Sequence, residues 1–211
     1  MILNLINQGG PVMWALFGGA FIAFSLIFYK SITILTLAYH HRKLHKIDQI
    51  AHYIEQNQFE EAKSLCLAHG PIKKLIERGI HCIESNHHNK SIEDQLEKIY
   101  DEEIHKLDNG LSIILILGEI MPMLGLLGTV TGMIHVFQAI SAYGTSNAQG
   151  MAAGISEALL TTQTGLILAL PILLFYTLLT QQIDNLSKKM RTIGSTIITA
   201  HQQHPSQKSN V

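Results

Sequence analysis

Apolar residues along this chain gather in three long runs that charged side chains almost avoid. The first run covers residues 12–38 and is interrupted by Lys30, the second covers residues 111–140, and the third covers residues 151–180. Each is longer than the roughly 18 apolar residues that suffice to cross the hydrocarbon core of a bilayer. The pattern therefore predicts an all-α membrane protein with three transmembrane helices, and it excludes a single soluble core.

Polar segments separate the three runs. Residues 141–150, rich in Ser, Gly and Asn, are typical of a turn between the second and third spans. In residues 39–110, apolar positions recur at helical spacing over residues 44–54, 62–66 and 72–85, so we expect helices there. A stripe from Leu96 to Leu111 enters the second span without an evident breaker, which predicts one continuous helix projecting from the membrane.

Positive charge is distributed on one side of the predicted spans. All 15 Lys and Arg residues fall at the end of the first run, in residues 39–110, or in residues 181–211. Because cytoplasmic loops are enriched in Lys and Arg, this places the N-terminal residues 1–11 and the turn 141–150 outside, in the periplasm. The segment 39–110 and the C-terminal helix and tail 181–211 are then expected in the cytoplasm.

Composition excludes several other classes of protein. Apolar residues make up 47% of the chain and charged residues 15%, and the net charge is −1. Without an overall basic field, we expect no nucleic-acid partner. The sequence shows no phosphate-binding Gly-Lys-Ser loop and no nucleophile with a base and an orienting acid, so we expect a protein that is not an enzyme.

Glu157 is the residue of the third span that most needs an explanation. An acidic side chain at the centre of a bilayer costs about 2.5 to 3.5 kcal/mol, so such residues usually face a bundle interior or a wet cavity and often serve proton relays. Since residues 111–180 contain no Lys or Arg, we expect no basic partner anywhere in the hairpin to neutralise it. We therefore interpret Glu157 as a proton-pathway group, with an interfacial acid that reaches for water as the alternative.

Small and hydroxylated residues line both long runs of the hairpin. Such residues allow two helices to approach closely, and we expect close packing at the glycines of both spans: Gly125, Gly128, Gly132, Gly154 and Gly165. Thr129 and Thr162 can present hydroxyl groups to a wet path. The alternative for each threonine is a hydrogen bond to a carbonyl group of its own helix.

Three further candidates are weaker. His135 could relay protons, because the reference pKa of a histidine side chain is near neutrality, although a lone histidine in a span is more often a satisfied core residue. Glu119 lies near the predicted cytoplasmic boundary, where its side chain can reach the interface. The pairs His41 with His45 and Cys66 with His69 lack the further ligands of a zinc site, so we predict neither a metal nor a cofactor.

Three segments of the hairpin resemble motifs of a known family. The segment Leu124-Gly125-Leu126-Leu127-Gly128-Thr129-Val130-Thr131-Gly132, followed by Gly154-Ile155-Ser156-Glu157-Ala158 and Thr161-Thr162-Gln163-Thr164-Gly165, looks like the MotA/TolQ/ExbB proton-channel family, closest to ExbB. The motif Gly9-Gly10-Pro11-Val12-Met13-Trp14 before the first span is a weaker likeness. Glu119 departs from the family pattern, which is usually apolar or small at that position.

The resemblance implies a multi-pass protein of the bacterial inner (cytoplasmic) membrane. It implies a homo-oligomer, typically a pentamer, around a single-span ExbD-like or TolR-like partner, with a TonB-like protein as the receiver of the work. Glu157 falls on the transmembrane glutamate of the family, and Thr129 and Thr162 fall on the threonines that line its ion path.

Several functions stay open at this point. The chain can be an ExbB-like subunit that powers TonB-dependent uptake at the outer membrane, a TolQ-like subunit for envelope integrity, or a passive scaffold for partner spans. A sodium-driven stator keeps the same architecture, because a lining of carboxyl and hydroxyl groups does not decide between H+ and Na+. The cargo depends on partners that these residues do not contain.

Overall fold

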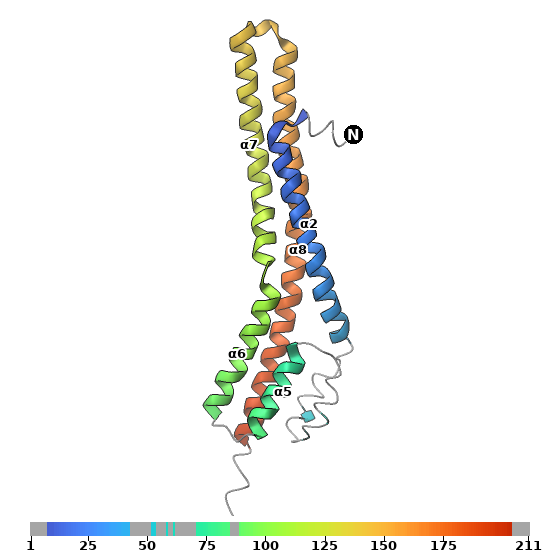
Figure 1. Ribbon diagram of the computed structural model, residues 1–211, viewed down its shortest axis with the longest axis vertical. Coiled ribbons are helices and arrows are strands. Elements are labelled where there is room, and N and C mark those ends of the chain that lie inside the picture. Colours follow the sequence, from blue (N-terminus) through green and yellow to red (C-terminus); the bar gives the residue numbers. More distant parts are fainter. Residues whose placement is uncertain are drawn as a thin grey trace, which may run out of the picture. The chain divides into compact units, whose positions relative to one another are not determined.

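The computed structural model describes residues 8–42, 52–53, 58, 61, 71–84 and 89–203. Within these residues every regular element is a helix (Figure 1). In chain order they are α2 (Gly10–Arg42), α5 (Pro71–Glu84), α6 (Asn89–Asp108), α7 (Leu111–Tyr143), the 3-10 helix η1 (Gly144–Ser146) and α8 (Ala148–Gln203). The predicted all-α class is confirmed.

Three helical segments are long and apolar enough to cross a membrane: Gly10–Ile34, Ile92–Ser146 and Ala148–Thr199. This number agrees with the three spans expected from the sequence. The span limits 12–38, 111–140 and 151–180, and the outside position of the N-terminus, stay predictions.

The chain divides into two compact units. The membrane unit consists of Met1–Ser31 and Gly110–Leu178, and the polar unit consists of Ile32–Asn109 and Leu179–Val211. In the membrane unit, α2 contributes a stripe of buried residues at alternating steps of three and four: Met13, Leu16, Ala20, Ala23 and Ile27. This spacing keeps one face of the helix on its neighbours. Lys30, at the next step of the stripe, is also buried.

The polar unit has a core made by three helices. Ile76 and Ile80 of α5 are fully buried, as are Ile193 and Ile197 of α8, while Leu96 supplies the contact from α6. The described part of residues 39–110 thus forms helices, as expected: α5 (Pro71–Glu84) lies within one residue of the predicted helix over residues 72–85 at each end. The helices predicted over residues 44–54 and 62–66 lie mostly outside the described residues.

The prediction of one continuous helix from α6 into the second span is wrong. Asn109 and Gly110 form a turn between α6 and α7, and Gly110 has φ +91°. That left-handed conformation is readily adopted by glycine because it lacks a Cβ atom. The Asn109 N–H group donates to the His105 carbonyl group (2.9 Å), which completes the end of α6. The apolar stripe continues from Leu107 to Leu111 across this turn, so the spacing of apolar residues gave no sign of the break.

The predicted turn over residues 141–150 is shorter in the structure. Helix α7 continues to Tyr143, and Gly144, with φ +65°, ends it while its N–H group donates to the Ile140 carbonyl group. Helix α8 then begins at Ala148, where the Asn147 side-chain oxygen accepts a hydrogen bond from the Gly150 N–H group (3.0 Å). Asparagine is a preferred residue at a helix start because its side chain satisfies one of the free N–H groups there.

Helices α7 and α8 approach each other at their backbones. A Cβ atom on Gly132 would lie 2.6 Å from the Gly154 carbonyl oxygen and 2.8 Å from the Ala158 nitrogen. A Cβ atom on Gly165 would lie 2.6 Å from the Met121 carbonyl oxygen. Backbone atoms cannot move aside as a flexible side chain can, so these glycines set the distance between the two helices.

We expect Gly132→Ala to destabilise the protein. The added methyl group has no space between the two backbones, and overpacking of this kind costs about 1 to 3 kcal/mol. The thermal unfolding midpoint of the purified protein in detergent is the measurement. Gly18→Ala is the matched control, because a Cβ atom at Gly18 meets nothing within 4 Å. Equal unfolding midpoints for the two variants would contradict the assigned packing.

Candidate functional site

The buried acid of the membrane unit is Glu157 in α8. Its side chain is 12% exposed, and Gly154, Ala158 and Thr161 on the same helix face are buried with it. A carboxyl group at this depth requires compensation, because burial without a partner disfavours its charged form.

His135 of α7 is the partner of Glu157. Its Nδ1 atom lies 2.7 Å from Glu157 Oε2, a distance typical of a hydrogen bond with a charged member. The expectation that the hairpin offers no basic partner is therefore wrong. The hairpin contains no Lys or Arg, but His135 lies one helical turn beyond Gly132, where α7 meets α8. The His135 side chain is 46% exposed, much more than that of Glu157.

The start of α2 is the second neighbour of the carboxyl group. A Cβ atom on Gly10 would collide with Glu157 Oε1, and Gly10 has φ +69°. Figure 1 shows that α2 begins beside the hairpin, below the tip formed by η1. The sequence identified Gly9-Gly10-Pro11 only as a breaker. The structure shows that the backbone of this breaker packs against the buried acid.

The two predicted threonines differ in their contacts. The Thr162 hydroxyl group donates to the Gly125 carbonyl group of α7 (3.0 Å), across the helix contact. The Thr129 hydroxyl group donates to the Leu126 carbonyl group of its own helix (2.6 Å), as the alternative reading anticipated. Thr161, which the sequence did not single out as a site residue, is fully buried and bonds to the Glu157 carbonyl group (3.0 Å).

The structure does not bring Glu119 to this group. It is exposed on α7 among exposed apolar side chains such as Ile116 and Met123. The separation from His135 is 16 residues of one helix, about 24 Å at 1.5 Å per residue. Glu119 therefore stands apart from the Glu157 site.

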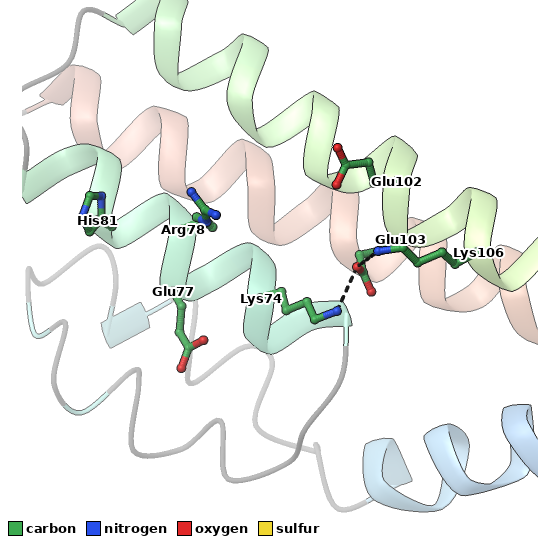
Figure 2. A pocket seen from close by; sticks show the side chains of 7 residues that line it. All are labelled: Lys74, Glu77, Arg78, His81, Glu102, Glu103 and Lys106. Atoms are coloured by element: carbon green, nitrogen blue, oxygen red, sulfur yellow. Dashed lines mark hydrogen bonds and ion pairs between the residues drawn. The ribbon is translucent and has the colours of Figure 1, made fainter.

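A second buried acid, Glu103, lies in the polar unit. It lies in a cleft of about 550 Å³. Figure 2 shows the other side chains that line this cleft: Lys74, Glu77, Arg78, His81, Glu102 and Lys106. The Glu103 carboxyl oxygen accepts hydrogen bonds from Lys106 (2.8 Å) and Lys74 (3.0 Å). Burial raises the pKa of Glu103, but these two bonds and the lysine charges outweigh it and lower the pKa below its ordinary value.

Another polar contact in the polar unit joins α6 to α8. The Arg191 side chain donates to the Tyr100 hydroxyl group (2.9 Å), and its guanidinium carbon lies 4.7 Å from the centre of the Tyr100 ring. The same hydroxyl group bonds to Ser187 (2.5 Å). In the described part of the chain, no group of three His, Cys, Asp or Glu side chains is placed to hold a metal ion.

Comparison with known proteins identifies relatives of this chain. A sequence model of the MotA/TolQ/ExbB proton channel family matches residues 67–192. An ExbB homologue of biopolymer transport from Methanothermobacter thermautotrophicus is 28% identical, over 93% of this chain and 71% of that protein. The biopolymer transport protein exbB1 of Vibrio cholerae is 33% identical, over 47% of this chain and 45% of that protein.

Two further matches belong to other branches. The Tol-Pal system protein TolQ of Haemophilus influenzae is 34% identical, over 40% of this chain and 37% of that protein. This chain thus spans less than half the length of the Vibrio cholerae and Haemophilus influenzae proteins. The solved structure of Campylobacter jejuni MotAB is similar in fold, with a TM-score of 0.55 over 91% of this chain and 85% of that one, at 17% identity.

The lysine contacts of Glu103 predict a pH-dependent contribution to stability. Because the folded pKa of Glu103 is lowered, this contribution is fully present above the unfolded pKa of about 4.3 and is lost as the pH falls through the folded pKa. Glu103→Gln should therefore lower the thermal unfolding midpoint at pH 7, and its difference from the wild type should shrink on acidification. Glu102→Gln, at the exposed neighbour, is the control. A difference that is constant with pH would count against the lysine contacts.

Proposed function

Since this chain belongs to the MotA/TolQ/ExbB proton channel family, we propose that it is an ExbB-like subunit of a complex that uses the proton motive force to power TonB-dependent uptake at the outer membrane. The main support for the proposal is that the Glu157 carboxyl group is buried in the membrane unit. It lies among closely packed helices there, and its hydrogen-bond partner is the imidazole ring of His135, a side-chain type that often serves as an acid or a base.

The ion path consists of groups that hold a proton or a small cation. Glu157 exchanges the ion, and the hydroxyl groups of Thr162 and Thr129 contribute polar atoms along the apolar hairpin. Movement of one charge across the membrane yields about 2.3 kcal/mol per 100 mV, which is the energy source of the complex. H+ is the proposed ion, and Na+ is the alternative to be tested by ion replacement.

The exposed apolar faces of α7 and α8 support an assembly in the membrane. Large side chains are exposed on both helices: Met123, Leu126, Phe137, Leu159 and Leu170. Lipid and other protein spans cover such faces in a bilayer. We propose a homopentamer of this chain around a single-span ExbD-like or TolR-like partner in the inner (cytoplasmic) membrane, with a TonB-like protein as the receiver. In this function the chain is not an enzyme, since it moves an ion and transforms no substrate.

A TolQ-like function in envelope integrity is the second candidate. The similarity to the Haemophilus influenzae TolQ protein, at 34% identity, favours it. A passive scaffold is the third reading, in which the glycine faces serve only to pack partner spans. Proton flux separates the scaffold from the two energised functions, and complementation separates those two functions from each other.

Glu157→Gln should abolish ion conduction while leaving assembly intact. The amide keeps the size of the side chain but cannot take up and release a proton, and we expect a loss of at least about tenfold. Proton flux into proteoliposomes that contain this chain with its single-span partner is the measurement. Ser156→Ala, at the exposed neighbouring residue, is the control and should keep the wild-type flux. Undiminished flux in Glu157→Gln would support the scaffold.

Complementation distinguishes the two energised functions. If the chain is ExbB-like, its expression with the single-span partner should restore growth on a chelated iron source to cells that lack ExbB. If it is TolQ-like, it should restore detergent resistance to cells that lack TolQ. Carrying Glu157→Gln through both assays shows whether the restored function depends on the ion path.

A further inference from the structure

The Glu157 carboxylate is held from two sides by two other helices. His135 of α7 contacts one oxygen through Nδ1 at 2.7 Å, and the backbone of Gly10, at the start of α2, lies against the other. We propose that His135 passes protons to and from Glu157, and that Gly10 positions the carboxylate for this exchange. This inference rests on the proposed role of Glu157 in the ion path and adds two residues to it.

Relative exposure assigns the direction of the exchange. The His135 side chain is 46% exposed and the Glu157 side chain 12%, so an incoming proton meets the imidazole ring first. In the starting state, the neutral ring carries its proton on Nδ1 and donates to the carboxylate. A proton from water binds Nε2, the Nδ1–H bond breaks, and a bond from Glu157 Oε2 to the same hydrogen forms.

The charge balances at each stage of this transfer. The pair starts with a charge of −1 and becomes neutral when Nε2 gains its proton, and it stays neutral while the Nδ1 proton moves to Oε2. It returns to −1 when the carboxyl group yields that proton toward the other side of the membrane. The ring then carries its hydrogen on Nε2, and release of that proton to water with uptake of another proton at Nδ1 restores the first tautomer.

Gly10 is the second contact of the Glu157 carboxylate, on the side of Oε1. A side chain there would occupy the position of Glu157 Oε1, and the left-handed φ of +69° favours glycine as well. The first N–H groups of a helix lack partners within the helix and carry partial positive charge, which suits an adjacent carboxylate. The start of α2 therefore orients Oε1 while Oε2 faces His135.

Other titratable groups do not share this contact. In the described part of the membrane unit they are Tyr29, Lys30, Glu119, Tyr143 and Tyr176. Tyr143 is the nearest of these along the chain, about two helical turns beyond His135 toward the tip. Glu119 and Tyr176 lie more than four turns from His135 and Glu157 on their respective helices. From α2 the carboxyl group meets the uncharged start of the helix. His135 is thus the titrating neighbour on which the exchange depends.

Chemical rescue tests the role of His135. His135→Ala should lower the proton flux of the reconstituted complex by at least about tenfold, since a positioned general acid or base contributes factors of about 10² to 10⁴. Added imidazole should restore flux in proportion to its concentration, because a free imidazole can carry the proton that the side chain carried. Wild-type flux in His135→Ala, or a loss that imidazole does not restore, would overturn the assignment.

Glu157→Gln, measured in the same flux assay, distinguishes a failure of the His135 role from a failure of the proposed ion path. If Glu157→Gln retains flux, the ion path itself is wrongly assigned. If Glu157→Gln abolishes flux while His135→Ala keeps it, the ion path stands and the role of His135 is overturned. Imidazole should not restore flux to Glu157→Gln, because the accepting carboxyl group is absent.

Gly10→Ala tests the positioning of the carboxylate, and the chain offers two matched controls. Gly144→Ala places a side chain at a similar left-handed φ of +65° with nothing within 4 Å, and Gly18→Ala alters α2 with nothing within 4 Å. Flux should fall by about tenfold in Gly10→Ala and stay at the wild-type level in both controls. Equal flux in the three variants would overturn the role of Gly10.

If the Gly10→Ala protein does not assemble with its partner, infrared spectroscopy of the chain alone can still test the role of Gly10. The carbonyl band of the protonated Glu157 side chain, identified by its absence in Glu157→Gln, should shift in Gly10→Ala and in His135→Ala. The purified chain in detergent suffices for this measurement. An unshifted band in Gly10→Ala would show that the backbone of Gly10 does not act on the carboxyl group.

Discussion

The backbone contact between α7 and α8 is the constraint on which the rest of the membrane unit depends. Glycines at the contact leave no side chain to separate the helices, so their register is fixed by main-chain atoms. Gly132 lies against Gly154 and Ala158, and the next turn of α7 therefore carries His135 to Glu157. The pairing of His135 with Glu157 is therefore a consequence of the glycine packing beside it, at Gly132 of α7 and at Gly154 and Ala158 of α8.

The identity of the partner decides what the buried acid can do. A charged group at the bilayer centre costs about 2.5 to 3.5 kcal/mol on insertion scales, and a hydrogen-bonded partner offsets part of that cost. An arginine would offset it too, but arginine stays charged and would hold the carboxylate ionised. An imidazole ring can be a neutral or a charged partner, so the hydrogen bond from His135 does not by itself require a permanent positive charge beside Glu157.

Much of this arrangement could be predicted from the sequence, and the reasons for the failures are specific. Hydrophobic runs predicted three spans because their length is set by the bilayer, and small residues predicted the close face at Gly132. The break at Gly110 could not be predicted from the apolar stripe, because the stripe continues across it. The contact of Gly10 with Glu157 joins residues far apart in the sequence, and periodicity carries no information on such pairs.

The two buried glutamates, Glu103 and Glu157, differ in the side chains that bind their carboxyl groups. Glu103 accepts hydrogen bonds from Lys74 and Lys106, which lower its pKa and keep it ionised at neutral pH. It therefore acts as a fixed charge that joins α5 to α6. Glu157 is about as deeply buried, but its hydrogen bond is to a single histidine, and its other oxygen faces an uncharged backbone. The same type of side chain thus joins two helices of the polar unit through two lysines, whereas in the membrane unit it is hydrogen-bonded to a histidine, where we propose that it exchanges an ion.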